Sequence, residues 1–423
     1  MIIHVFCENN LVWRSPFFAK FSLILTLLVC LSIFSADSLQ AAENITPMTE
    51  DAAAFAVNSL AVDLYRAFAK DLGCENICFS PYSVSTTFAM TYAGAAGDTA
   101  AEMEKLLYYS DEIHESNAAL LKGFAGAPEG SGQLSTANSI WPQRDYRLLN
   151  SFTRLLASAY EASARPLDYK NQPDRSRAEI NDWVAKHTND KIQDILPSGS
   201  VRSDTRLVLV NAVYFKAPWL DEFRETLNYE SDFFASPDAS APAVMMRSVR
   251  YTPYFETDET QVLKLPYARG VYSMIIFLPK ERDGLGAIEG KLALGGLDDL
   301  RNRVERRRVD VNIPKFRLES SFDLTETLKN LGVGSAFDED LADFSLMNGK
   351  RNLYINVASH KAIVEVDERG TEAAAATAIS AARATALLKE EEPVIFRADH
   401  PFIFLIQDEA SGTILFMGRV SKP

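Results

Sequence analysis

EVDERGTEAAAATAISAARATALLKEEEP, residues 365–393, is the stretch of sequence that decides the fold of this chain. Helix propensity alone predicts a helix through its alanine run, because alanine is the best helix former. The segment has no apolar stripe that could hold a helix against a core, however, and an unpacked helix of this length is marginal in water. It is also longer than most loops of a compact domain, and loops of such length are usually functional or disordered.

Written as a strand, the same segment has one face made only of small or apolar side chains. That face carries Thr371, Ala373, Ala375, Thr377, Ile379 and Ala381. The opposite face begins with the charged Glu372. Because a central strand cannot accept a charge on its buried side, this pattern predicts an arm that can enter between two existing strands. Gly370 lies just before the arm and supplies the backbone freedom for a hinge.

In the rest of the chain, the pattern of apolar residues changes from helix-like to strand-like near residue 206. Before it, apolar residues recur at helical spacing. Helices are expected over residues 57–68, 82–108, 115–125, 150–162 and 181–195. After it, RLVLVNAVYFK (206–216) is typical of a strand buried on both faces. Further strands are expected at residues 245–255, 261–266, 272–279, 309–316, 361–366, 401–407 and 413–420. Helices first and strands later predict an α+β fold in one domain.

Composition and motifs exclude several classes of function. The chain has 423 residues, 47% of them hydrophobic, and a formal net charge of −14. An acidic balance argues against nucleic-acid binding, which depends mainly on lysine and arginine. There is no G-x-S-x-G elbow, P-loop, dinucleotide fingerprint or H-E-x-x-H motif. We therefore do not expect an enzyme, a metal site or a cofactor.

Residues 1–42 have the layout of a secretory signal peptide. Arg14 and Lys20 precede an apolar run, FSLILTLLVCLSIF (21–34), and small residues follow it, with Leu39, Gln40 and Ala41 resembling a cleavage site. The run is short for a helix that needs roughly twenty residues to span a bilayer, although an uncleaved anchor is the alternative. We expect residues 43–423 to form the mature domain, secreted to the extracellular space, or to the periplasm if the source is bacterial.

Two local patterns leave alternatives open. In the mature chain, Cys74 and Cys78 could form a local disulfide in an oxidising compartment, or Cys78 could be a buried thiol. A run of arginines could be a solvated face or a patch for anionic glycans, and its interruption by Glu305 and Asp310 favours the solvated face. The run consists of Arg301, Arg303, Arg306, Arg307 and Arg308.

Several long motifs, in the right order, resemble the serpin family. Residues 365–379, FRADHPFIFLI (396–406) and GTILFMGRV (412–420) resemble its hinge and C-terminal signature, and NAVYFKAPW (211–219) and FSPYSVSTTFAMTYAGAAGDT (79–99) resemble its central strand and buried helix. The resemblance extends from about residue 50 to the end. It implies a serpin fold, with about nine helices, three β-sheets including a large central one, and an exposed reactive-centre loop at about residues 368–393.

The resemblance also implies an activity. Serpins offer the reactive-centre loop to a serine protease, and after cleavage the hinge side inserts as a new central strand and traps the acylated enzyme. The new strand would form on the order of ten or more hydrogen bonds at about 0.5–1.5 kcal/mol each, so the uncleaved state must be trapped kinetically. The expected partner is a serine protease, with a cysteine protease as an alternative. The main alternative function is a non-inhibitory serpin with a carrier, chaperone or storage role. We expect a monomer, and no heparin cofactor because residues 112–125 are not basic.

Residue roles follow the same resemblance. The hinge consists of Glu368, Gly370, Thr371, Glu372, Ala373, Ala374, Ala375 and Ala376. The shutter, a polar cluster beneath the central strands, consists of Ser80, Ser83, Asn211 and His360. The breach, where insertion starts, contains Trp219 and Lys315, and Lys315 is expected to pair with Glu368.

The position of the scissile bond sets the class of protease. The usual spacing from the hinge glycine places it between Ala384 and Thr385, which suits an elastase-like enzyme with a small pocket. A hinge shorter by one residue would place it between Arg383 and Ala384, which suits a trypsin-like enzyme, whose pocket holds a carboxylate.

Overall fold

The structure is a computed structural model of the chain, and it describes residues 50–292, 294–371 and 392–423. Within these residues, helices predominate in the first part of the chain and strands in the second, so the predicted α+β class is confirmed. All the described residues belong to one compact unit. The predicted leader, residues 1–42, lies outside the described residues.

The smaller sheet has five strands and is built around β3 (Leu207–Pro218) and β10 (Val357–Val366). Its order is β2 (Gln133–Pro142), β3, β11 (Gly370–Thr371), β10 and β9 (Phe316–Asp323). Strands β3 and β10 run parallel and pair directly over seven residue pairs. Beyond these pairs, the two-residue strand β11 lies between them and is antiparallel to both. The sheet is therefore closed along most of its centre and open at one end.

The larger sheet has nine strands. In order it contains β1 (Ile77–Phe79), β14 (Ile414–Val420), β13 (Phe402–Asp408), β7 (Tyr272–Pro279), β6 (Thr260–Pro266), β5 (Ala239–Glu256), β8 (Glu305–Pro314) and β12 (Val394–Arg397), and β4 (Tyr229–Ser236) pairs with β5. The 18-residue strand β5 pairs with β8 on one side and with β4 and then β6 on the other. Because β5 is shared in this way, the three sheets that the family implies form two hydrogen-bonded sheets among the described residues.

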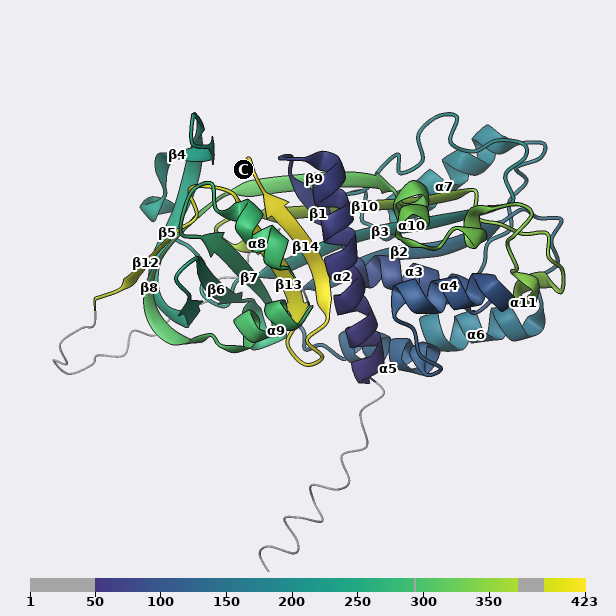
Figure 1. Cartoon of the computed structure of the whole chain (residues 1–423), viewed down its shortest axis with the longest axis horizontal. Coiled ribbons are helices and arrows are strands. Elements are labelled where there is room, and N and C mark those ends of the chain that lie inside the picture. The colour runs from purple at the N-terminus through teal and green to yellow at the C-terminus, as the bar shows by residue number, and fades with distance from the viewer. Residues whose placement is uncertain (1–49, 293, 372–391) are drawn as a thin grey trace, which may run out of the picture. The chain divides into compact units, whose positions relative to one another are not determined.

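Ten α-helices are present in the described part of the chain (Figure 1). They are α2 (Glu50–Leu72), α3 (Pro81–Tyr92), α4 (Gly97–Leu107), α5 (Ile113–Ala125), α6 (Asn150–Tyr160), α7 (Pro173–His187), α8 (Leu285–Lys291), α9 (Leu294–Asn302), α10 (Leu324–Leu331) and α11 (Ser345–Asn348). Helix α3 is buried over almost its whole length and contacts β2, β3 and β14, so it lies between the two sheets. Its N-cap is Ser80, whose hydroxyl accepts a hydrogen bond from the Ser83 backbone N–H (3.1 Å). None of the described helices is both long and apolar enough to cross a bilayer.

Helix α7 packs on the other face of the smaller sheet, and its bounds correct the predicted helix 181–195. Its apolar side chains join a core with residues of β2, β3 and β10. The helix begins at Pro173, because proline is well suited to the first turn. It ends at His187, and Asn189 and Asp190 then adopt positive φ angles. The chain turns back so that the backbone N–H of Leu196 donates to Asn181 (3.0 Å).

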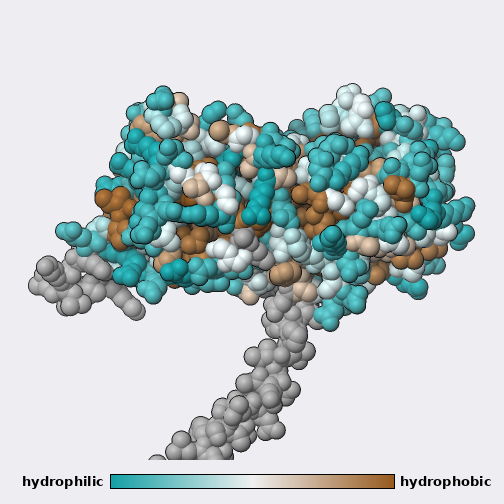
Figure 2. All heavy atoms as spheres, in the orientation of Figure 1, coloured by the Kyte–Doolittle hydropathy of each residue, from teal (hydrophilic) through white to brown (hydrophobic). Residues whose placement is uncertain are grey.

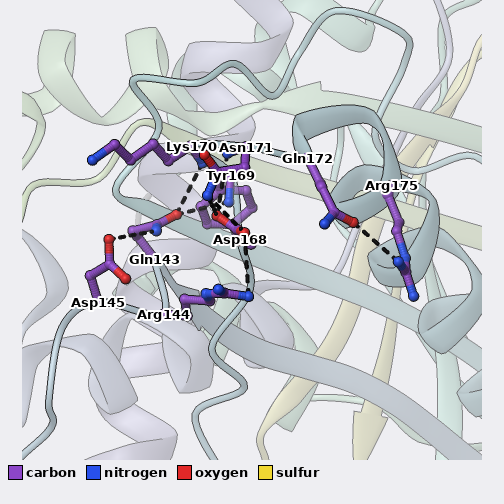
Figure 3. A network of polar contacts seen from close by, with 9 residues as sticks. All are labelled: Gln143, Arg144, Asp145, Asp168, Tyr169, Lys170, Asn171, Gln172 and Arg175. Carbon is purple, nitrogen blue, oxygen red and sulfur yellow. Dashed lines mark hydrogen bonds and ion pairs between the residues drawn. The ribbon is translucent and has the colours of Figure 1, made fainter.

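A polar network ties the segment ahead of α7 to the end of β2 (Figure 3). The Gln143 side-chain oxygen accepts hydrogen bonds from the backbone N–H groups of Tyr169 (2.8 Å) and Lys170 (3.3 Å). Arg144 forms an ion pair with Asp168 (3.3 Å). Because Tyr169 is fully buried, this network holds the start of α7 in place beside the sheet.

Other predicted bounds also needed correction. The pattern over 82–108 corresponds to two helices, α3 and α4, because the chain turns between them and Gly97 adopts a positive φ of 55°. The strand predicted at 309–316 is β8, which ends at Pro314, and a further strand, β9, follows. Strands β2, β4, β9 and β12 were not predicted. Strand β2 was missed because polar residues make up half of it and interrupt any apolar run.

Cys74 and Cys78 are free thiols, so the alternative of a local disulfide is not what the structure contains. Cys78 is fully buried in β1, and burial raises the pKa of its thiol well above the ordinary value. Cys74 is exposed. Since the thiolate is the reactive form, the two cysteines should differ in reactivity.

We predict that iodoacetamide alkylates Cys74 in the native protein and leaves Cys78 unmodified. Mass spectrometry of the tryptic peptides measures each site separately. In concentrated guanidinium chloride, both cysteines should react, which serves as the control. Labelling of Cys78 at the rate of Cys74 in the native state would show that β1 is not held as described.

Candidate functional site

The four predicted shutter residues lie together beneath the parallel pair β3 and β10. Asn211 and His360 are direct partners in the parallel ladder, and the His360 Nδ1 atom is hydrogen-bonded to the Asn211 Oδ1 atom. The other ring nitrogen, Nε2, accepts a hydrogen bond from the Ser80 backbone N–H (3.0 Å). The Asn211 amide nitrogen donates to the Ser83 hydroxyl (2.6 Å). The cluster therefore joins both central strands to helix α3.

Two further members of this cluster were missed by sequence analysis. The Asn211 amide nitrogen is also within hydrogen-bonding distance of the Thr87 hydroxyl (2.9 Å) and the Asn138 Oδ1 atom (2.9 Å). The Ser83 hydroxyl donates to the same Asn138 oxygen (2.6 Å). Asn138 lies on β2, so the cluster also holds the neighbouring strand. No local pattern signals the role of Asn138, because that role depends on which strand lies beside β3.

The protonation of His360 follows from its surroundings. The side chain is fully buried, and burial lowers the pKa of His360 to about 3, so the ring is neutral near pH 7. A neutral imidazole has one N–H, and Nε2 accepts a hydrogen bond from Ser80. The proton is therefore on Nδ1 and is donated to the Asn211 oxygen. The ring also stacks on Phe322, with an angle of 12° between the planes.

We predict that the His360 ring makes the protein less stable as the pH falls below about 6.5. In the unfolded chain the ring has its ordinary pKa of 6.5 and takes up a proton, whereas the folded protein keeps it neutral down to about pH 3. The free energy of unfolding should fall by about 1.4 kcal/mol per pH unit within this window, or about 2 kcal/mol between pH 7 and pH 5. Urea unfolding at both values, compared with His360→Gln, isolates this contribution. Equal pH dependence in the two proteins would contradict it.

At the open end of the smaller sheet, the breach residue Trp219 contacts the turn between β10 and β11. Its ring stacks on Tyr267, with centroids 4.4 Å apart and planes 8° apart. The indole N–H donates to the carbonyl oxygen of Asp367 (3.0 Å). The Trp219 backbone N–H donates to the carbonyl oxygen of Arg369 (2.8 Å). Trp219 thus holds the start of the hinge through both its side chain and its backbone.

The predicted pair of Lys315 and Glu368 is present, with Lys315 Nζ 3.0 Å from Glu368 Oε2. Glu368 is buried, and Asn228 also donates a hydrogen bond to its carboxylate. Burial tends to raise the pKa of Glu368, but hydrogen bonds from its own backbone, Lys315 and Asn228 outweigh this and lower it. Because the Lys315 side chain is 42% exposed, the ion pair itself is worth only about 0–1 kcal/mol. Its main effect is to provide the buried Glu368 carboxylate with a charged partner, since an unpaired buried charge is costly.

Strand β11 places the first hinge residues inside the sheet. Thr371 is fully buried and pairs with Ala217 of β3 and Val366 of β10. Its hydroxyl is hydrogen-bonded to the Tyr267 hydroxyl (2.7 Å). The side chain therefore points into the core, on the face of β3 that also carries Asn211.

Gly370 is needed for a reason that sequence analysis did not identify. Its φ of 154° is uncommon for other residues, and an added Cβ would lie 2.1 Å from the Ala217 carbonyl oxygen and 2.6 Å from the Pro218 Cα atom. Close approach of the β3 backbone thus excludes a side chain here. The predicted role in hinge freedom is a separate property.

We predict that Gly370→Ala displaces β11 from the sheet and destabilises the protein by about 1–3 kcal/mol, because the new methyl group would overlap the β3 backbone. Thermal unfolding measures the effect. The matched control is Gly123→Ala in helix α5, where nothing lies within 4 Å of an added Cβ. In a helix this change should be neutral or stabilising. Equal stability of the two variants would contradict the close approach at residue 370.

The remaining predicted site residues lie outside the described residues. They are Glu372, Ala373, Ala374, Ala375, Ala376, Arg383, Ala384 and Thr385. The described residues contain no group of three or more His, Cys, Asp or Glu side chains that could hold a metal ion. The described site is a sheet in which a buried polar cluster joins the paired strands β3 and β10, and in which β11 lies between these strands beyond their paired residues.

These features define an α+β protein with a short strand, β11, between the parallel strands β3 and β10. Comparison with known proteins identifies the family. A family profile described as "Serpin (serine protease inhibitor)" matches residues 55–423, and this chain belongs to the serpin family.

Individual relatives span nearly the whole domain. An uncharacterized serpin-like protein of Thermococcus kodakarensis is 40% identical over 375 residues, which cover 87% of this chain and 85% of the relative. Leukocyte elastase inhibitor of Equus caballus is 38% identical over 373 residues, 86% and 97% of the two chains. The solved structure of human thyroxine-binding globulin with thyroxine has a TM-score of 0.79 at 25% identity and covers 89% of this chain and 99% of that one.

These comparisons correct the statement that the chain is not an enzyme, which was drawn from missing motifs. The family match replaces that prediction with a class of protein, because the matching family is described as one of serine protease inhibitors. As inhibitors, serpins are not enzymes in the catalytic sense. The class of this chain therefore rests on its family and not on the catalytic motifs that its sequence lacks.

Proposed function

We propose that this chain is a secreted serpin that inhibits a serine protease as a suicide substrate, through insertion of its cleaved hinge between β3 and β10. The observation that carries the proposal is β11. Its two residues already occupy, between β3 and β10, the position that a complete inserted strand would take. The first part of the arm is thus in place, in the right orientation, before cleavage.

The register of β11 supports insertion of the arm that follows it. Thr371 pairs with Ala217 on one side and with Val366 on the other. If the strand continued in this register, Thr377 would lie opposite Asn211 of β3 and also opposite His360 of β10. Two independent pairings therefore place the same residue at the shutter. On the small-residue face beyond Thr371, Thr377 is the first polar residue, and it would arrive where the core is polar.

The energetics of insertion are favourable once the arm is cut. Opening the sheet breaks the seven parallel pairs between β3 and β10 and the contact between Asn211 and His360. In the register above, residues 372–380 would then pair with both strands. At about 0.5–1.5 kcal/mol net per hydrogen bond, plus burial of the small-residue face, insertion would be worth on the order of 10 kcal/mol. An uncut arm is tethered at both ends, so it is held out kinetically.

The kind of protease follows from the scissile bond. Cleavage between Ala384 and Thr385 suits an elastase-like enzyme, and the relative named as a leukocyte elastase inhibitor supports this choice. Cleavage between Arg383 and Ala384 by a trypsin-like enzyme is the alternative, and a cysteine protease is a further one. Secretion is proposed from the leader at residues 1–42 alone.

The test is to incubate the protein with elastase and with trypsin and to separate the products on a denaturing gel. We expect a complex that survives denaturation and a released C-terminal peptide that begins at Thr385 with elastase, or at Ala384 with trypsin. The cleaved protein should also unfold at a higher temperature than the intact one. Cleavage without a complex would support a non-inhibitory role, and human thyroxine-binding globulin, a protein of this fold, is named for binding thyroxine.

We predict that Ala375→Arg converts the inhibitor into a substrate that is cleaved without forming the complex, because the inserted residue 375 would bring a charge into the core. Glu372→Arg is the matched control. It places the same side chain on the opposite face, at a position that already carries a charge and that would lie beside the partly exposed Lys216 and Glu365. The control should still form the complex. A full yield of complex from Ala375→Arg would overturn the assignment of the buried face.

A further inference from the structure

A basic and partly apolar surface lies on the outer side of β5, β8 and β12, which we call the β5–β8–β12 face. It consists of Arg247, Val249, Tyr251, Arg306, Arg308, Ile395 and Arg397. Ladder pairing sets its geometry. Val249 pairs with Asp310, which pairs with Ile395, so these three side chains lie on the same side of the sheet.

The exposed apolar side chains of this face lie on β5 and β12, on either side of β8. Ile395 is 65% exposed, Tyr251 is 52% exposed and Val249 is 44% exposed. In Figure 2, hydrophobic side chains reach the surface at the left edge, over the end of the sheet where Figure 1 labels β5, β8 and β12. Single exposed apolar residues are ordinary, but several on one face of a sheet, interspersed with arginines, are typical of an interaction site.

The charge of the face is opposite to that of the chain as a whole. The chain has a formal net charge of −14, whereas the face carries four arginines and one acidic neighbour, Asp310. Two of the guanidinium groups are oriented by aromatic rings: Arg306 lies 5.9 Å from the Tyr251 ring and Arg397 lies 5.9 Å from the Tyr229 ring. Arg247 is held by two hydrogen bonds to Asp310 (2.9 and 2.7 Å). A partner that fits this face is acidic.

The face is close in sequence to the bond that a protease would cut. Strand β12 begins at Val394, ten residues after Ala384. Even a fully extended chain of that length spans at most roughly 35 Å, which is about the diameter of a small domain. A protease engaged at the scissile bond is thus within reach of the β5–β8–β12 face.

We propose that the β5–β8–β12 face is a docking surface for the target protease, which presents an acidic surface beside its active-site cleft. This inference rests on the proposed inhibitory function. Charged and apolar contacts here act on the encounter with the protease and not on strand insertion, so they raise the rate of association.

The experiment uses the full chain and whichever of elastase or trypsin forms the complex, before and after succinylation of the protease's lysines. Succinylation makes the protease acidic, and hydrolysis of a small chromogenic substrate corrects for any lost activity. If the total charge of −14 governs the encounter, succinylation slows association. If the β5–β8–β12 face governs it, succinylation accelerates association by about tenfold at low salt.

The test variant is the double substitution Arg306→Glu and Arg397→Glu, which should abolish this acceleration. Arg147→Glu with Arg154→Glu is the matched control, because it changes the net charge equally and lies at or near α6, at the other end of the domain in Figure 1. The control should retain the acceleration. Ile395→Ser should slow association at every salt concentration, because it removes an apolar contact. Equal rates for wild type and test variant, or an equal loss in the control, would overturn the proposal.

A second measurement separates this proposal from the proposed function. Equilibrium binding to a succinylated protease whose catalytic serine is replaced by alanine needs no covalent trap. If no complex forms on gels but this binding is weakened by the test variant, inhibition fails and the docking surface stands. If complexes form but binding is unaffected by the test variant, the docking surface fails and inhibition stands. An effect of the arginines that appears only with an added anionic polysaccharide, or only on self-association, also overturns docking of the protease.

Discussion

The parallel pairing of β3 and β10 is the constraint on which the rest of this structure depends. Parallel pairs are slightly less stable per residue than antiparallel ones, and this pair joins two strands that are far apart in the sequence. It ends where β11 enters between the strands, antiparallel to both. A strand that continued β11 would replace one parallel contact with two antiparallel ones. Under the proposed function, the chain thus has a better-paired arrangement that it would reach only after the arm is cut.

The shutter contributes to the stability of the closed sheet and, under the proposed function, sets a requirement for the inserted strand. His360, Asn211, Ser80 and Ser83 satisfy one another's hydrogen bonds, so the closed sheet leaves these buried polar groups paired. Leaving them unpaired would be costly, which gives the closed state local stability. If the arm inserts as proposed, the same requirement would apply to the inserted strand, which must then supply a polar group at this level. In the register of β11, Thr377 would meet that requirement, whereas the alanines around it would need only to be small.

Much of this could be predicted from the sequence, and the limits have physical causes. Strand β7 was predicted with its observed bounds, since an apolar run between turn residues is a local signal. The family motifs predicted the shutter residues Asn211 and His360, although they lie 149 positions apart. Asn138 and Tyr267 were missed because their roles depend on which strand lies beside them, which no local pattern encodes. Gly370 was recognised as special, but the approach of the β3 backbone that excludes a side chain there is a tertiary fact.

If the chain acts as the trap proposed above, its structure separates two tasks that fall at different times. Choosing a protease depends on the encounter, and the groups suited to it are exposed arginines and apolar side chains on β5, β8 and β12. Holding the protease depends on strand insertion, and the groups suited to it are buried on β3, β10 and α3. The two sets share no residue, and they belong to different sheets. The surface can therefore change to suit a different protease without altering the stability of the sheet, and the sheet's free-energy difference is available to whichever enzyme makes the cut.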